Sequence, residues 1–188
     1  MSLARAFAIV TLFCAWVLPV GASAQNDVTA ALPALTDMKL VRSNMPDAPK
    51  TLVAETDEIP DSPTRIHDKA AAERIFANEG ITLQWIGWEK RGQAWVAVDE
   101  GGHWVLMAGQ YAREKGTLDL EGFITEIGSD YFIFEGTVKI FGAPDKERMC
   151  RKTKPWRFAI TQNRKYYRLR EFEWCDGLTD YIDLYFKP

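Results

Sequence analysis

The sequence predicts an all-β domain: a small antiparallel barrel of about eight strands, with one short helix on its N-terminal side. From residue 81 onward, apolar and polar residues alternate with a period of two, and aromatic and β-branched residues are frequent. Short turns separate these alternating segments, and no helical pattern lies between them. Such a series is typical of an antiparallel meander that closes as a barrel or folds as a sandwich.

Two segments precede the predicted domain. Residues 1–24 have the three parts of a secretory signal peptide: a positive charge at Arg5, an apolar run over residues 6–20, and Ala22-Ser23-Ala24 before the cleavage point. A membrane-spanning helix needs about 20 apolar residues. We therefore expect cleavage near Ala24 and export to the periplasm or the medium rather than membrane anchoring. No further stretch of the sequence has the length of a transmembrane segment.

Residues 25–65 differ from the rest of the chain. They hold five of the nine prolines and no aromatic residue. A segment of this composition buries too little apolar surface to offset the entropy lost on ordering. The composition predicts a flexible leader, and a tail that folds on a partner is the alternative.

The remaining elements follow in order along residues 66–188. Apolar residues at helical spacing predict a short helix over residues 66–79, with Gly80 as its left-handed cap. Eight strands are then expected, at residues 81–88, 94–99, 103–111, 117–127, 131–141, 156–161, 165–174 and 179–186. Glycines inside these strand patterns favour a barrel over a sandwich, because strands must bend at the corners of a small barrel. They are Gly87, Gly109, Gly122 and Gly136.

Two cysteines remain in the predicted mature chain, Cys150 and Cys175, because Cys14 leaves with the signal peptide. In an oxidising compartment, two cysteines of one domain usually pair. The alternatives are a metal site and a catalytic thiol. A metal site needs more ligands, and the two histidines, His67 and His103, lie far from the cysteines in sequence. The sequence therefore predicts a disulfide, and neither a metal nor another cofactor.

Motifs of catalysis are not found in the sequence, which has no Gly-x-Ser-x-Gly and no phosphate-binding glycine-rich loop. His103 follows a hairpin turn, and neither neighbour offers it an orienting acid. Carboxylates are plentiful, including Asp180 and Asp183, so acid–base hydrolysis is the alternative. The sequence leaves enzymatic activity open and favours a protein without it.

Positive charge is concentrated in residues 144–174, with ten bases against four acids in a chain of formal net charge −3. One face of the strand predicted at 165–174 carries Tyr166, Arg168, Arg170, Phe172 and Trp174. Such a face can stack on rings and bind carboxylates or phosphates. The alternative is that Arg168 and Arg170 pair with acids on an exposed sheet.

These observations predict an exported binding or inhibitory module that recognises an anionic or aromatic partner. The candidate partners are an anionic glycan, a lipid and an acidic protein, and no nucleic acid is expected. An envelope hydrolase with a carboxylate pair and a structural envelope component are the alternatives. The architecture resembles small exported barrels such as lipocalins and the lysozyme inhibitors of bacterial envelopes. The lipocalin Gly-x-Trp motif is not met, because Gly87 directly precedes Trp88.

Overall fold

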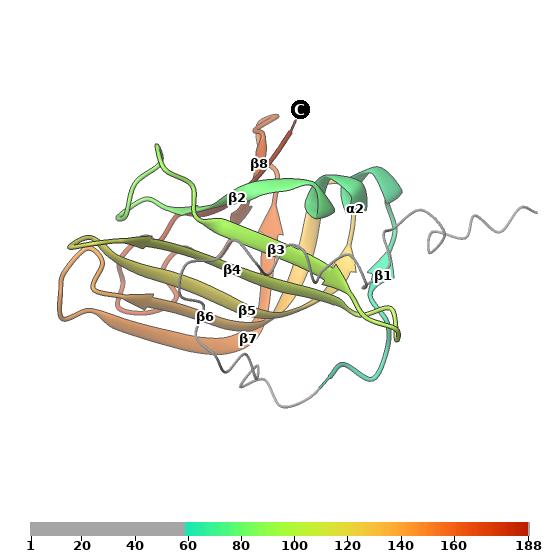
Figure 1. Ribbon diagram of the computed structural model, residues 1–188, viewed down its shortest axis with the longest axis horizontal. Helices are drawn as coiled ribbons and strands as arrows, with labels where there is room; N and C mark the ends of the chain where they lie inside the picture. The colour runs from blue at the N-terminus through green and yellow to red at the C-terminus, as the bar shows by residue number, and fades with distance from the viewer. Residues whose placement is uncertain (1–58, 188) are drawn as a thin grey trace, which may run out of the picture. The chain divides into compact units, whose positions relative to one another are not determined.

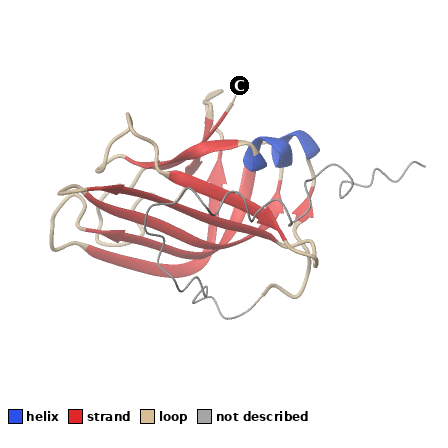
Figure 2. Cartoon of the chain, in the orientation of Figure 1, coloured by secondary structure: helices blue, strands red, loops and turns tan. Residues whose placement is uncertain are grey.

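The computed structural model describes residues 59–187, which form one short helix and a set of strands around a common core (Figures 1 and 2). The predicted signal peptide, and residues 25–58 of the predicted leader, lie outside the described residues. The elements are β1 (Arg65–Ile66), α2 (Lys69–Phe76), β2 (Asn78–Leu83), β3 (Gln93–Val98), β4 (Trp104–Ala112), β5 (Gly116–Ile127), β6 (Tyr131–Phe141), β7 (Met149–Ala159), β8 (Tyr166–Leu169) and β9 (Ile182–Phe186).

Eight of the strands form one antiparallel sheet in the order β2-β9-β8-β7-β6-β5-β4-β3. The two ends of this order meet where Ile81 of β2 exchanges two backbone hydrogen bonds with Gly92, at 3.1 and 2.7 Å. The sheet is therefore a nearly closed barrel, in which β3 to β7 run side by side in Figure 1. This confirms the predicted all-β fold and decides for a barrel against a sandwich.

Aromatic side chains fill the interior of the barrel. The largest are Trp104, Trp156, Tyr167, Phe132, Phe134 and Phe158, each at most 1% exposed. The rings of Phe132 and Phe158 stack with centroids 4.9 Å apart, and Trp156 Nε1 donates a 2.9 Å hydrogen bond to the carbonyl of Gly136. Each ring removes a large apolar area from water, so this packing is the main stabilisation of the fold. Because side chains occupy the interior, we expect partner recognition on the outer surface.

The single helix of the described residues, α2, is shorter than predicted. Asp68 caps it by accepting a 2.7 Å hydrogen bond from the backbone N–H of Ala71. It ends at Phe76 because Asn78 already pairs with β9. Within residues 59–187, no helix has the length and apolar character needed to cross a membrane.

Gly80 does not cap the helix, which corrects the prediction. It lies in a bulge of β2 with φ +100°, where a Cβ atom would clash with the carbonyl oxygen of Gly92. The glycine therefore permits the close backbone approach that closes the barrel. Gly122 of β5 and Gly136 of β6 lie opposite each other, and a Cβ atom on either would clash with the backbone of the neighbouring strand. This agrees with the prediction that glycines inside these strands belong to a barrel.

Four predicted strands differ from those observed by three residues or more. The strand predicted at 81–88 is β2, which ends at Leu83 and leaves Gly87 outside any strand, and the strand predicted at 179–186 is β9, which begins at Ile182.

Strand β7 begins at Met149, seven residues before the predicted start. Its first part is an edge, since β8 pairs only with Phe158 and Ala159, and an edge tolerates Pro155 and two lysines. Strand β8 ends at Leu169 rather than continuing to residue 174. Residues 170–181 instead form a loop between β8 and β9.

The last residues of the predicted leader attach to the barrel. The Thr64 hydroxyl donates to the carbonyl of Ile124 at 2.5 Å and accepts from the backbone N–H of Trp104 at 2.9 Å. Arg65 pairs in parallel with Glu126 of β5. The barrel therefore includes Thr64 and Arg65, before the predicted domain start at residue 66.

Candidate functional site: an aromatic–arginine face

Rings and guanidinium groups gather on the outer surface of β8 and β9. Tyr167 and Leu169 point into the core, so the alternating residues Tyr166 and Arg168 point outward. On β9, Asp183 and Tyr185 lie on the same outer side, because the residues that alternate with them belong to the core. We call this surface the aromatic–arginine face. It consists of Trp88, Arg91, Arg164, Tyr166, Arg168, Arg170, Phe172, Tyr181 and Tyr185.

Arg168 lies at the centre of the face. Its Nε and Nη2 donate to the two carboxylate oxygens of Asp183 at 2.6 and 2.7 Å. Asp183 is fully buried, and only 12% of the Arg168 side chain is exposed. The hydrogen-bonded carboxylate raises the pKa of Arg168 above its ordinary value, so the guanidinium stays charged. Arg168 is thus paired with an acid within the sheet.

Three rings surround the Arg168 guanidinium. Its Cζ atom lies 4.2 Å from the ring centroid of Tyr181, 5.1 Å from that of Tyr166 and 5.7 Å from that of Trp88. Such cation–π contacts hold rings and charge together. Trp88 is 44% exposed. The buried ion pair therefore positions an aromatic surface that solvent can reach.

Further contacts extend the face in two directions. Towards β2, Tyr166 packs against Tyr185 at 5.3 Å, and Arg91 lies 4.1 Å over the Tyr185 ring. Towards the 170–181 loop, Phe172 meets Tyr181 edge-on at 5.3 Å, and Arg170 lies 4.9 Å over Phe172. The rings and guanidinium groups thus form one continuous surface.

The charges of the face are only partly balanced. Arg91 pairs with Glu79 at 2.6 Å, as Arg168 does with Asp183. Arg164 donates instead to the uncharged side chain of Gln162 at 2.7 Å and lies over Tyr166, while Arg170 lies over Phe172. Arg164 also interacts electrostatically with Asp183, but that carboxylate is bound by Arg168, so Arg164 and Arg170 each add a positive charge to the face.

Four of the five residues predicted for the binding face come together here: Tyr166, Arg168, Arg170 and Phe172. Trp174 does not, which corrects the prediction. It is 8% exposed and packs against Trp156 in the core, with ring centroids 5.3 Å apart. The alternation of β8 does not extend to Trp174, because β8 ends at Leu169 and residues 170–181 form a loop.

Sequence reasoning missed Trp88, Arg91, Tyr181 and Tyr185, and it counted Arg164 among the bases of residues 144–174 without placing it on the face. Trp88 and Arg91 follow β2, far from β8 along the chain, and only the strand order β2-β9-β8 brings them together. The alternation on the last strand was a usable signal for Tyr185, since it places that residue opposite the core side.

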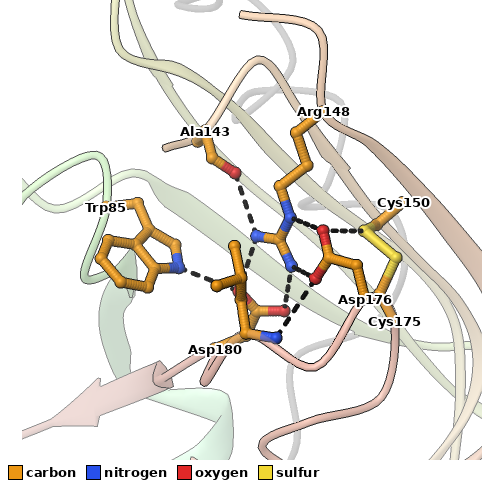
Figure 3. The surroundings of a disulfide bond; sticks show 8 residues. Trp85, Ala143, Arg148, Cys150, Cys175, Asp176 and Asp180 are labelled. Carbon is orange, nitrogen blue, oxygen red and sulfur yellow. Dashed lines mark hydrogen bonds and ion pairs between the residues drawn. A yellow bond between two sulfur atoms is a disulfide. The ribbon is translucent and has the colours of Figure 1, made fainter. Parts of the chain in front are cut away.

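A disulfide and a buried arginine hold the loop that carries Arg170, Phe172 and Tyr181 (Figure 3). Cys150 and Cys175 are bonded, with Cα atoms 6.0 Å apart, which confirms the predicted pair. Beside it, Arg148 lies between Asp176 and Asp180. Its side chain donates two hydrogen bonds to each carboxylate and one to the carbonyl of Ala143, at 2.8–3.0 Å.

Arg148 therefore uses all five of its N–H groups inside the protein. Asp180 is fully buried and also accepts a 3.0 Å hydrogen bond from Trp85 Nε1. The network joins the loop before β7, the loop after β2 and the 170–181 loop. It fixes the position of residues on the aromatic–arginine face without being part of that face.

The acids considered for acid–base chemistry have structural partners. Asp180 and Asp183 are bound by Arg148 and Arg168 respectively. His103 does have an orienting acid, which corrects the sequence analysis: its Nδ1 lies 2.9 Å from Oδ2 of Asp99, four residues earlier. The same carboxylate accepts from the His103 backbone N–H at 2.8 Å, so this pair closes the β3–β4 turn.

One group of side chains within residues 59–187 has the spacing of metal ligands: Cys150, Cys175 and Asp176. Both sulfur atoms are joined in the disulfide, so neither is a thiolate available to a metal. The carboxylate of Asp176 is already bound by Arg148. The group is therefore part of the loop anchor.

A sequence model of the PM1083 family matches residues 63–186. The chain belongs to the PM1083 family. A relative, the uncharacterized protein PM1083 of Pasteurella multocida (strain Pm70), is 33% identical over 129 residues, which cover 68% of this chain and 80% of the relative. No solved structure matches the chain. The segment matched to the PM1083 family includes the strands β2 to β9 and every residue of the aromatic–arginine face.

We expect acid to weaken the loop anchor through Asp176. Its hydrogen bonds with Arg148 lower the pKa of this carboxyl below its ordinary value. A lowered folded-state pKa stabilises the protein above the unfolded value of about 4, and this stabilisation is lost as pH falls through the lowered pKa. Asp176→Asn should therefore be less stable than the wild type at pH 7, with a difference that shrinks below pH 4. Urea unfolding at several pH values measures it.

The exposed acid Asp145 on the β6–β7 turn provides the matched control. Asp145→Asn should leave the pH dependence of unfolding as in the wild type. A difference between Asp176→Asn and the wild type that stays constant from pH 7 to pH 2 would contradict the role given to Asp176.

Proposed function

We propose that this member of the PM1083 family is an exported, non-catalytic binding module that recognises an anionic partner through the aromatic–arginine face. The observation that carries the proposal is the placement of Arg164 and Arg170, two guanidinium groups held over rings, neither of which forms an ion pair with a carboxylate among the described residues. Asp183 interacts electrostatically with Arg164, but both of its oxygens already accept hydrogen bonds from Arg168. Arg164 and Arg170 lie on a surface whose centre is already fixed by the Arg168–Asp183 pair.

The chemistry of the guanidinium group supports an anion as the partner. Arginine is always charged, is weakly hydrated, and can give two parallel hydrogen bonds to a carboxylate or phosphate. Stacking on a ring restricts the side chain before it binds, which lowers the entropy lost on binding. Export of the chain is supported by the signal-peptide pattern of residues 1–24 and by the Cys150–Cys175 disulfide.

The test replaces both unbalanced arginines. Arg164→Gln/Arg170→Gln should bind an anionic partner at least tenfold more weakly than the wild type, and its binding should depend less on salt, because surface charges are screened over about 8 Å at physiological ionic strength. The probes are immobilised dextran sulfate, vesicles containing phosphatidylglycerol, and poly-glutamate, each at two salt concentrations. Thermal unfolding of both proteins checks that the fold is retained.

Arg113 on the β4–β5 turn is exposed and lies outside the face, so Arg113→Gln is the matched control. It should bind like the wild type. Equal loss of binding in Arg113→Gln and the double variant would indicate general charge attraction. Unchanged binding of every probe by the double variant would refute the proposal.

A further inference from the structure

We infer that the anionic partner is an acidic oligosaccharide, bound along the face with a sugar ring against Trp88 and acidic groups at Arg164 and Arg170. This inference rests on the proposed function and names the chemical class of its ligand. It follows from three features of the face: the exposed tryptophan, the separation of the unbalanced charges, and the number of rings between them.

The exposed ring of Trp88 favours a sugar over a lipid surface. Exposed large apolar residues within residues 59–187 are Ile59, Trp88, Tyr111 and Met149. Trp88 alone among them belongs to the aromatic–arginine face, whereas docking on a lipid surface requires several apolar side chains that insert together. A single flat ring with polar surroundings instead suits a pyranose, whose C–H groups can cover the ring while its hydroxyls stay hydrated.

The rings also favour a sugar over an acidic peptide. An acidic peptide needs cations and offers few flat surfaces for stacking. This face has four further rings, Tyr166, Phe172, Tyr181 and Tyr185, each in contact with another ring and a guanidinium group. Aromatic rings that alternate with guanidinium groups can stack on the sugar rings of a ligand and pair with its acidic groups.

The arrangement of charges indicates a ligand of several sugar units. Arg168 is occupied by Asp183 and serves as a positioning residue for Trp88 and Tyr181. The unbalanced cations lie further out: Arg164 beyond Tyr166, and Arg170 beyond Tyr181 and Phe172. Since these intervening groups lie between Arg168 and each outer arginine, a ligand of several sugar units, rather than one monosaccharide, is expected to contact Trp88 and both arginines.

The experiment is isothermal titration with a panel of uronate-, sulfate- and phosphate-bearing tetrasaccharides, each compared with its neutral counterpart, its monosaccharide and tetra-glutamate. We expect at least one acidic tetrasaccharide to bind at least tenfold more tightly than these three comparators. Trp88→Ala should reduce that binding at least tenfold. Tyr111→Ala removes an aromatic residue that is 75% exposed in β4, outside the face, and should leave binding unchanged.

The outcomes separate this inference from the proposed function. If tetra-glutamate binds as tightly as every acidic tetrasaccharide, or Trp88→Ala binds like the wild type, the saccharide inference is wrong while binding through Arg164 and Arg170 still stands. If no acidic tetrasaccharide of the panel binds, the inference is also wrong. If no anionic probe responds to Arg164→Gln/Arg170→Gln, the proposed function itself fails. Thermal unfolding of Trp88→Ala ensures that lost binding reflects the ring.

Discussion

Replacing Arg148 by Met is expected to lower the free energy of unfolding by about 3–5 kcal/mol, the typical cost of leaving a buried charge without its partner. Asp180 is fully buried and would lose both of its hydrogen bonds from Arg148, and the carbonyl of Ala143 would lose another. Methionine preserves much of the side-chain volume, so the loss reports the missing hydrogen bonds. Urea unfolding at pH 7 measures it.

Two further variants make the Arg148 prediction specific. Arg113→Met on the exposed β4–β5 turn should change stability by less than about 0.5 kcal/mol. Asp180→Asn in the Arg148→Met background removes the unpaired charge and should recover part of the loss. If Arg148→Met lowers the free energy of unfolding by less than about 1 kcal/mol, the disulfide alone holds the 170–181 loop.

Replacing Arg168 by Met is expected to have a similar effect, about 3–5 kcal/mol, because Asp183 is also fully buried and both of its oxygens accept hydrogen bonds from Arg168. This expectation differs from that for an exposed charge, whose removal rarely costs much. Chemical unfolding of the wild type, Arg168→Met, Asp183→Asn and the double variant forms a complete double-mutant cycle.

The cycle distinguishes a buried pair from two independent residues. The double variant should be more stable than the sum of the single losses predicts, because it contains no unpaired buried carboxylate. Arg170→Met provides the matched control on the same face, and it should cost much less because Arg170 contacts a ring rather than a buried acid. Strict additivity in the cycle would show that Arg168 and Asp183 do not stabilise each other.

Local sequence was sufficient to predict the bounds of a strand where both sides of that strand are paired and one face is buried. The strands predicted at 117–127 and 131–141 agree with β5 and β6 to within one residue, since their alternation continues to a Gly-Ser-Asp turn. Local sequence was insufficient to predict the start of β7, which lies at an edge of the sheet. The first half of β7 carries Pro155 and charged residues, a composition that is unfavourable in a central strand but acceptable where no neighbour pairs.

The same contrast applies to the candidate site. Alternation along β8 correctly grouped Tyr166 with Arg168, but it could not detect that the strand ends at Leu169 and that Trp174 enters the core. Nor could it identify Asp183 as the partner of Arg168. That contact depends on the pairing of β8 with β9, which joins residues in register across two strands.

The sequence by itself determined the fold class, the short helix before the barrel and the Cys150–Cys175 pair. These depend on local periodicity and on the number of cysteines, both of which can be counted along the chain. Tertiary structure alone decided which arginines are occupied, which remain unbalanced and which rings surround them. The strand order β2-β9-β8 brings Trp88 against Arg168 and places Asp183 beneath it, and such contacts between distant segments leave no period in the sequence.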